Sequence, residues 1–201
     1  MMFILTCCLL AQTAPLEASA LTAAVQAPRT DAVEFEMGGI RFRSDAPVSP
    51  ALRRSLEAQV RIVEALRVSP RVAAFLRSVP VRLSQSLRQA GASGPDGVVL
   101  TAEPVPPDNP VLLHELLHVY HFRQLPQGIG NAAVEQAYQA ASAGGRWPPQ
   151  SYMLSNKREF FAMTASAVLH GRVARPPFTG AAVRERMPAY HRWLLEEFSR
   201  P

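Results

Sequence analysis

The sequence is poor in cysteine, and its two cysteines, Cys7 and Cys8, are adjacent near the start of a chain of 201 residues. No cysteine follows them, which excludes a disulfide framework in the rest of the chain. Internal repeats, low-complexity tracts and blocks of Lys or Arg are also lacking, so the sequence gives no support to a repeat architecture or to nucleic-acid binding. The formal net charge of +5 favours contact with anionic surfaces but specifies no partner.

The first twenty residues have the pattern of a secretory leader. An apolar run over residues 2–11 is followed by Ala18-Ser19-Ala20, which matches the small-x-small cleavage pattern. The run is too short to span a bilayer, and no Lys or Arg precedes it, unlike a typical leader. We expect residues 1–20 to be a signal peptide, residues 21–32 a linker, and residues 33–201 one secreted or periplasmic domain without a membrane span.

The N-terminal part of this domain is predicted to contain a small sheet. Alternating residues on both sides of Gly38-Gly39 predict a hairpin over 33–43. The dipeptides Ser49-Pro50 and Ser69-Pro70 each combine a helix cap with Pro at the first helical position. They predict one helix to about Arg67 and a shorter second helix. Two more short strands are expected.

These two strands are expected at 79–83 and 98–101, with a loop over 91–97 between them. One helix is predicted to start at Asp108-Asn109-Pro110, where a cap is followed by Pro at the first helical position, and to end before Pro126. Further helices are predicted over 132–143, 157–169 and 181–198. Together these elements predict an α+β fold, a small sheet with five or six helices.

The motif His-Glu-Leu-Leu-His occupies residues 114–118 on the predicted helix. Helical residues turn about 100° and rise about 1.5 Å each, so His114 and His118 lie about 40° and one turn apart. Both imidazoles can therefore reach one metal ion, and Glu115 lies close enough to act on a water held there. The rest of the helix is apolar around most of its circumference, which predicts that it is buried. Titratable side chains on a buried helix need partners, and a metal supplies them.

A catalytic zinc usually takes three protein ligands and one water, and three residues are candidates for the third ligand. His121 lies about 10 Å further along the helix axis than His114, which favours an ordinary packed or surface His. Glu135 is on the next predicted helix, where an exposed residue is the favoured interpretation. Glu159 follows Asn156 with capping-box spacing. Spacing alone leaves Glu159 open as a ligand or as a cap.

The motif at 114–118, followed by Tyr152-x6-Glu159-Phe-Phe-Ala, resembles the catalytic domain of anthrax lethal factor and related zinc peptidases. The resemblance covers roughly residues 97–170. It implies a zincin-like fold, with the small sheet on the N-terminal side of the active-site helix. It also implies that Glu159 is the third zinc ligand and that Tyr152 stabilises the oxyanion. The family often has an acidic residue shortly after Phe-Phe-Ala, where this chain has Met163, so the group that orients a zinc-bound His is unassigned.

The sequence therefore predicts a zinc endopeptidase of the gluzincin type that binds one Zn²⁺ per chain and acts on a peptide or protein. His114, His118 and Glu159 would hold the ion, Glu115 would be the general base and Tyr152 the oxyanion donor. The strand over 98–101 would form the edge of the cleft. One alternative is a non-catalytic zinc-binding domain that recognises a peptide or an envelope partner, and another is a helical domain without metal.

Overall fold

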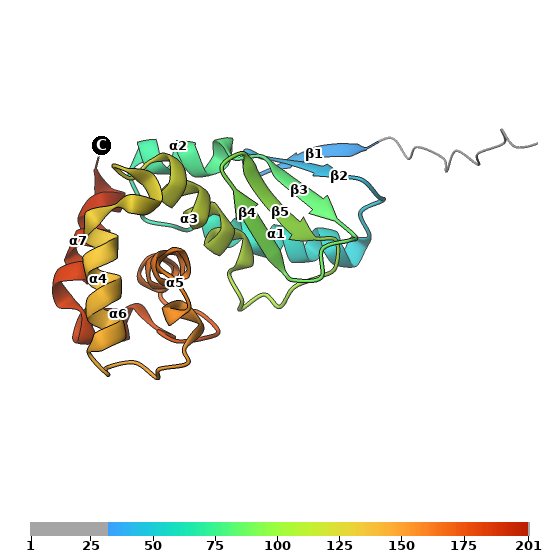
Figure 1. Cartoon of the computed structure of the whole chain (residues 1–201). Coiled ribbons are helices and arrows are strands. Elements are labelled where there is room, and N and C mark those ends of the chain that lie inside the picture. The colour runs from blue at the N-terminus through green and yellow to red at the C-terminus, as the bar shows by residue number, and fades with distance from the viewer. Residues whose placement is uncertain (1–31, 201) are drawn as a thin grey trace, which may run out of the picture. The chain divides into compact units, whose positions relative to one another are not determined.

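The computed structural model describes residues 32–200. The predicted signal peptide and nearly all of the predicted linker lie outside the described residues. Within them, a five-stranded sheet is formed by the N-terminal part, and seven α-helices make up most of the remainder (Figure 1). The α+β class and the small sheet on the N-terminal side are confirmed. None of the described helices is long and apolar enough to cross a membrane.

The sheet has the strand order β1-β2-β3-β5-β4. The strands are β1 Val33–Met37, β2 Ile40–Ser44, β3 Val81–Ser84, β4 Gly91–Gly94 and β5 Gly97–Thr101. The three central strands, β2, β3 and β5, run parallel, whereas β1 and β4 are antiparallel to their neighbours. Gly38 and Gly39 connect β1 to β2 with φ of 56° and 77°, which confirms the predicted hairpin and explains its two glycines.

The predicted loop over 91–97 is wrong, because β4 occupies much of it. Gly91 pairs with Leu100 of β5, so β4 rather than β5 is the edge strand beside the helices. A Gly-rich segment lacks the alternation that reveals a strand. Gly91 is required here by a close approach: a Cβ atom on it would lie 2.7 Å from Cγ of Glu115 and 3.0 Å from a methyl group of Val111.

The helices follow the predicted boundaries closely except at the C-terminal end. They are α1 Pro50–Glu64, α2 Pro70–Ser78, α3 Val111–Arg123, α4 Ala132–Ala143, α5 Lys157–His170, α6 Gly180–Arg186 and α7 Pro188–Ser199. Ser49 and Ser69 accept the hydrogen bonds expected of helix caps. The single helix predicted over 181–198 is wrong, because Met187 leaves the helical region and Pro188 starts a new helix. The described helices therefore outnumber the five or six expected.

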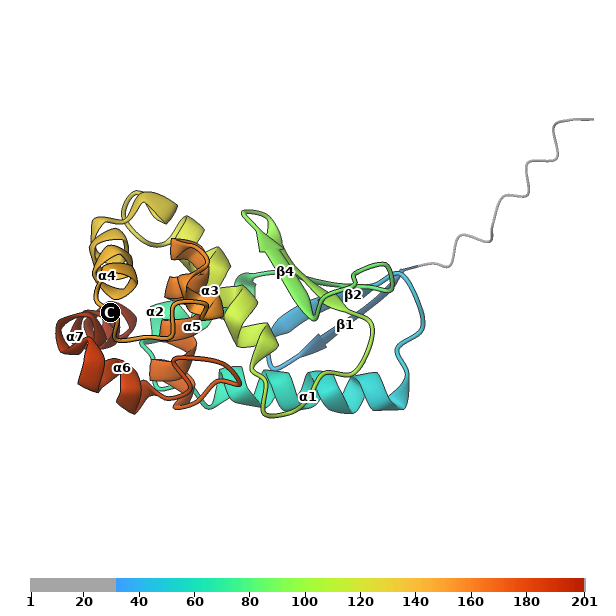
Figure 2. The same ribbon diagram turned by 60° about the horizontal axis from the view of Figure 1, so that its bottom comes forward.

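Helix α3 runs between the sheet and the C-terminal helices, and α1 lies along the sheet (Figure 2). Every α3 residue from Val111 to His121 is buried except His114, which is partly exposed. The predicted burial of this helix is confirmed. Near its C-terminal end, the Tyr120 hydroxyl donates a 2.9 Å hydrogen bond to the buried Glu197 carboxylate on α7. Contacts on all sides therefore fix the position and rotation of α3.

The start of α3 is held by a side chain from α1 rather than by the predicted cap. Helix α3 begins one residue later than expected, and Pro110 at its cap position makes no side-chain hydrogen bond. The buried Gln59 amide takes over this role. Its Oε1 accepts a 3.1 Å hydrogen bond from the Leu112 N–H, and its Nε2 donates one of 2.8 Å to the Asn109 carbonyl. Gln59 thus satisfies the Leu112 N–H, which the helix start leaves unpaired, and adds a second donor to the Asn109 carbonyl, which already accepts from the Val111 N–H.

We predict that Gln59→Leu lowers the free energy of unfolding by about 1–3 kcal/mol, because the buried Leu112 N–H loses its partner and the Asn109 carbonyl keeps only its hydrogen bond from the Val111 N–H. Urea unfolding of the metal-free protein measures this loss. The matched control is Gln136→Leu at an exposed position of α4, which should change stability by less than about 0.5 kcal/mol. Equal stability of the two variants would contradict the role assigned to Gln59.

Candidate metal centre

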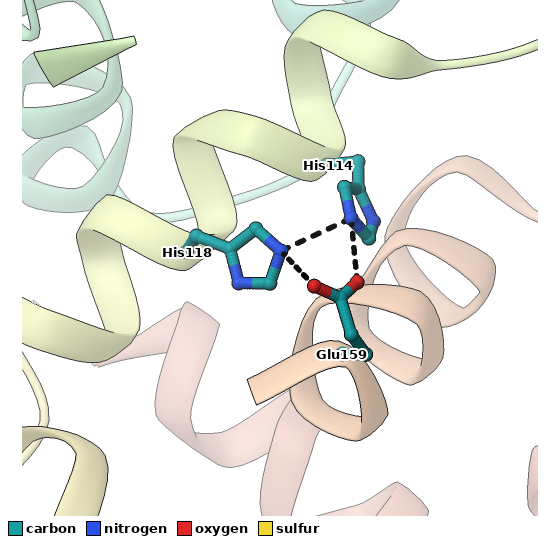
Figure 3. Close-up of side chains that lie close together, drawn as sticks. All are labelled: His114, His118 and Glu159. Atoms are coloured by element: carbon teal, nitrogen blue, oxygen red, sulfur yellow. Dashed lines mark hydrogen bonds and ion pairs between the residues drawn. The ribbon is translucent and has the colours of Figure 1, made fainter. Parts of the chain in front are cut away.

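Two histidines on successive turns of α3 direct their ring nitrogens to one point (Figure 3). The Nε2 atoms of His114 and His118 lie 3.1 Å apart, and the ring planes are nearly perpendicular. His118 is buried, whereas His114 is partly open to solvent. This is the arrangement that the one-turn spacing of the motif predicts.

Helix α5 brings a carboxylate to the same point. Asn156 caps this helix, and its Oδ1 accepts hydrogen bonds from the N–H groups of Arg158 and Glu159. The Glu159 carboxylate turns to the histidines rather than back to the cap. Its Oε2 lies 3.1 Å from Nε2 of His114, and its Oε1 lies 3.3 Å from Nε2 of His118 (Figure 3). Between the two interpretations left open by spacing, the side-chain geometry favours the ligand.

The electrostatics of this cluster keep Glu159 ionised. Burial alone would raise the pKa of its carboxyl group, but the hydrogen bonds and charges of His114 and His118 together lower that pKa well below its usual range. The cluster therefore presents two imidazoles and one carboxylate, whose donor atoms all lie within 4.8 Å of one another. Such a group could bind a metal ion.

Glu115 lies beside the cluster, and a residue of the edge strand holds its carboxylate. The Ser93 hydroxyl on β4 donates a 2.6 Å hydrogen bond to Oε2 of Glu115, which is buried. The sequence analysis missed Ser93, because its segment was interpreted as a loop and no motif connects it to α3. This hydrogen bond and the close packing of Gly91 against Glu115 join the edge strand directly to the motif helix.

Tyr152 and Arg175 lie at the mouth of a cavity of about 210 Å³ beside the cluster, which His114 and Glu115 also line. Tyr152 belongs to the short 3₁₀ turn η2, Tyr152–Leu154, and is 43% exposed. Burial and the negative charge of Glu159 raise the pKa of Tyr152 above its usual value, so its hydroxyl stays protonated. The sequence-predicted Tyr152 thus lines the cavity, and its hydroxyl interacts with Glu159 of the cluster.

The two other candidate ligands lie outside the cluster. Glu135 on α4 forms a 2.7 Å ion pair with Lys157. His121 is buried with its ring 4.6 Å from the ring of Phe161, as expected for a packed histidine. Neither side chain belongs to the group of donors formed by the two motif histidines and Glu159.

Met163 occupies the position where the resemblance led us to look for an acid. It is a buried residue of α5 and lines the cavity beside His114. Among residues 32–200, no side chain or backbone group hydrogen-bonds to the buried Nδ1 of His118. Within this part of the chain, no other acid replaces the missing one as a partner of that ring nitrogen.

The motif helix beside the sheet and the later helix together bring two imidazoles and one carboxylate into one candidate metal-binding cluster. Among solved structures, the chain is similar to the Pro-Pro endopeptidase from Paenibacillus alvei, with a TM-score of 0.55 and 15% sequence identity. The match covers 78% of this chain and 97% of that chain. At this identity the likeness concerns the fold, and it agrees with the α+β architecture expected from the sequence. Neither protein-family models nor curated protein sequences match the chain.

We predict that His121 makes the stability of the metal-free protein depend on pH. Burial and the charge of His118 lower the pKa of His121 from 6.5 to about 4. The unfolded chain therefore binds this proton first, so the contribution is complete above pH 6.5 and is lost as pH falls towards 4. The loss is about 3 kcal/mol. Denaturant unfolding across this range should show a shallower pH dependence for His121→Leu; parallel curves for the two proteins would contradict the prediction.

Proposed function

We propose that the chain is a zinc-dependent endopeptidase that hydrolyses peptide bonds. The observation that carries this proposal is the convergence of His114, His118 and Glu159, with the carboxylate of Glu115 and an open cavity directly beside them. The similarity of the fold to an endopeptidase supports a peptide as the substrate. The leader pattern of residues 1–20 supports action in a secreted or periplasmic location.

The spacing of the three donors fits zinc. Zinc binds imidazole nitrogen and carboxylate oxygen at about 2.0–2.2 Å and prefers tetrahedral geometry, which places neighbouring ligand atoms about 3.3 Å apart. The two ring nitrogens lie 3.1 Å apart, and each lies 3.1–3.3 Å from a different oxygen of Glu159; with one donor atom from each residue, all three lie within 4.8 Å of one another. Two neutral imidazoles and one carboxylate also leave a fourth position for water or substrate.

The side chains of this chain then have distinct tasks. When bound, zinc supplies Lewis acidity, which lowers the pKa of water and polarises the scissile carbonyl. Glu115 accepts the proton of the attacking water and later gives it to the leaving amine. Ser93 holds the Glu115 carboxylate through its 2.6 Å hydrogen bond and thereby sets the direction from which the proton is taken. Ser93 acts through Glu115 and is a positioning residue.

Substrate binding and oxyanion stabilisation are assigned to two different elements that line the cavity, β4 and the turn with Tyr152. The protonated hydroxyl of Tyr152 donates to the carbonyl oxygen as negative charge develops on it. The outer edge of β4 has no neighbouring strand among the described residues. An extended peptide can pair with this edge through main-chain hydrogen bonds. The scissile bond would then lie between the edge strand and Tyr152.

We predict that the purified protein binds about one zinc per chain. Glu159→Ala should abolish stoichiometric binding, because it removes one of three ligands. Glu135→Ala is the matched control and should keep its zinc, since Glu135 pairs with Lys157 instead. Elemental analysis after dialysis measures the metal content. A parent protein without zinc, even after refolding with zinc, would overturn the proposed function.

We predict that Glu115→Gln retains zinc but loses peptide cleavage by about a hundredfold or more. Ser93→Ala should lower kcat by about tenfold with little change in KM, and Ser93→Thr should restore most of kcat because it keeps the hydroxyl. Steady-state kinetics on a synthetic peptide measure both effects. Zinc binding without cleavage by the parent protein would instead support a non-catalytic recognition domain. Unchanged cleavage in Glu115→Gln would rule out this mechanism.

A further inference from the structure

One arginine faces the cavity of the candidate metal centre without a carboxylate partner. Arg175 lies in the loop between α5 and α6 and lines the cavity together with His114 and Glu115. Its guanidinium carbon is 5.2 Å from the centre of the Tyr152 ring. Among the described residues, no ion pair or hydrogen bond engages its guanidinium group.

The loop holds the backbone of Arg175 in a defined position. The Phe178 N–H donates a 2.8 Å hydrogen bond to the Arg175 carbonyl, and the Val173 N–H donates one of 2.8 Å to the Phe178 carbonyl. Arg172 and Thr179 form a β-bridge that closes the loop. The backbone position from which the Arg175 side chain extends is therefore fixed. The stacking of the guanidinium group on Tyr152 directs the side chain along the cavity.

The nearby carboxylates of the chain are committed to other groups. Glu159 contacts the two motif histidines, and Glu115 accepts the hydrogen bond from Ser93. The five N–H donors of the guanidinium group are therefore open to a ligand, and their planar arrangement matches a carboxylate. The donors lie next to the position proposed for the scissile bond.

Arg175 also lines a second hollow next to the cavity of the candidate metal centre. Tyr152 and Arg175 also line a neighbouring hollow of about 700 Å³, whose walls include Pro148, Pro149 and Leu154. The two side chains thus form the boundary between the cavity at the metal centre and this hollow. A peptide that occupied both hollows would lie against Arg175 and Tyr152, which line both.

We propose that Arg175 forms a subsite for a substrate carboxylate next to the scissile bond, which makes the chain selective for acidic peptides. The inference rests on the proposed peptidase function and defines its substrate class. The carboxylate can come from an Asp or Glu side chain or from the carboxyl terminus of the peptide. Both sources present the same planar group to the arginine.

The test compares matched peptides with the full chain loaded with zinc. A library of randomised peptides with blocked ends first identifies cleaved sequences by mass spectrometry. The best sequence is then made with Glu, Gln or Lys at each position around the cleaved bond, and with a free or an amidated carboxyl terminus. For one source of carboxylate, we expect kcat/KM to exceed that of the neutral analogue by about tenfold at low salt, with a smaller ratio at high salt.

Three variants assign this preference to Arg175. Arg175→Lys should keep a reduced preference for the acid, and Arg175→Glu should invert it in favour of Lys. Arg172→Glu makes the same charge change at an exposed position of the same loop and should retain the parent preference. If Arg175 only supported Tyr152, its loss would slow all peptides equally. An acid-to-amide ratio that is the same in the parent and in Arg175→Glu would overturn the proposal.

A binding measurement separates this proposal from the peptidase function. Fluorescence anisotropy is measured with Glu115→Gln and with the double variant that adds Arg175→Glu, on labelled peptide pools that are randomised except for one fixed Glu, Gln or Lys and for a free or an amidated carboxyl terminus, so that no prior cleavage is needed. A preference for acidic peptides that the second substitution abolishes supports the subsite, even if the parent cleaves no peptide and the peptidase function fails. Cleavage by the parent without any charge preference in rate or binding overturns the subsite and leaves the peptidase function intact.

Discussion

The burial of α3 from Val111 to His121, broken only by the partly exposed His114, is the constraint on which the rest of the structure depends. A helix that is apolar around most of its circumference has to be enclosed, and here the sheet edge, α1, α2 and α5 enclose it, while α7 contacts its Tyr120. Partners at both ends, Gln59 at the start and Glu197 near the end, limit its rotation and sliding. The strip that carries His114 and His118 therefore faces one direction only. A metal-binding geometry needs this kind of enclosure, because donor atoms must be held in place before the ligand arrives.

The third donor depends on where α5 begins. Asn156 satisfies two N–H groups of the first turn, including that of Glu159, so the side chain of Glu159 is not needed at the helix end. This frees the carboxylate to approach the histidines. Burial disfavours the ionised form of Glu159, but its interactions with the two imidazole rings more than offset this effect and lower its pKa. The cap and the cluster are thus compatible, although the sequence presents them as alternatives.

Local patterns were sufficient to predict the hairpin, the Ser-Pro helix starts and the buried motif helix, and together with the family resemblance they predicted that His114, His118 and Glu159 lie close together. Each of these depends on residues within a few positions of one another, or on the family resemblance at Tyr152 and Glu159. The contacts that were missed join distant segments. Gln59 reaches the start of α3 from α1, and Ser93 reaches Glu115 from a strand without alternation. Neither pair has a spacing rule, so only the folded chain reveals them.

The composition of β4 follows from its contact with α3 rather than from strand stability. Glycine weakens a strand, yet this strand begins and ends with glycine. Gly91 lets the backbone approach Glu115 closer than any Cβ atom would permit, and two residues later Ser93 reaches the carboxylate of the same Glu115. A peptide that pairs with the free edge of β4 would restrain the strand that orients Glu115. In the proposed peptidase, substrate binding and orientation of the base would therefore be coupled through one short strand, and this coupling would account for a weak strand-forming sequence at the edge of the sheet.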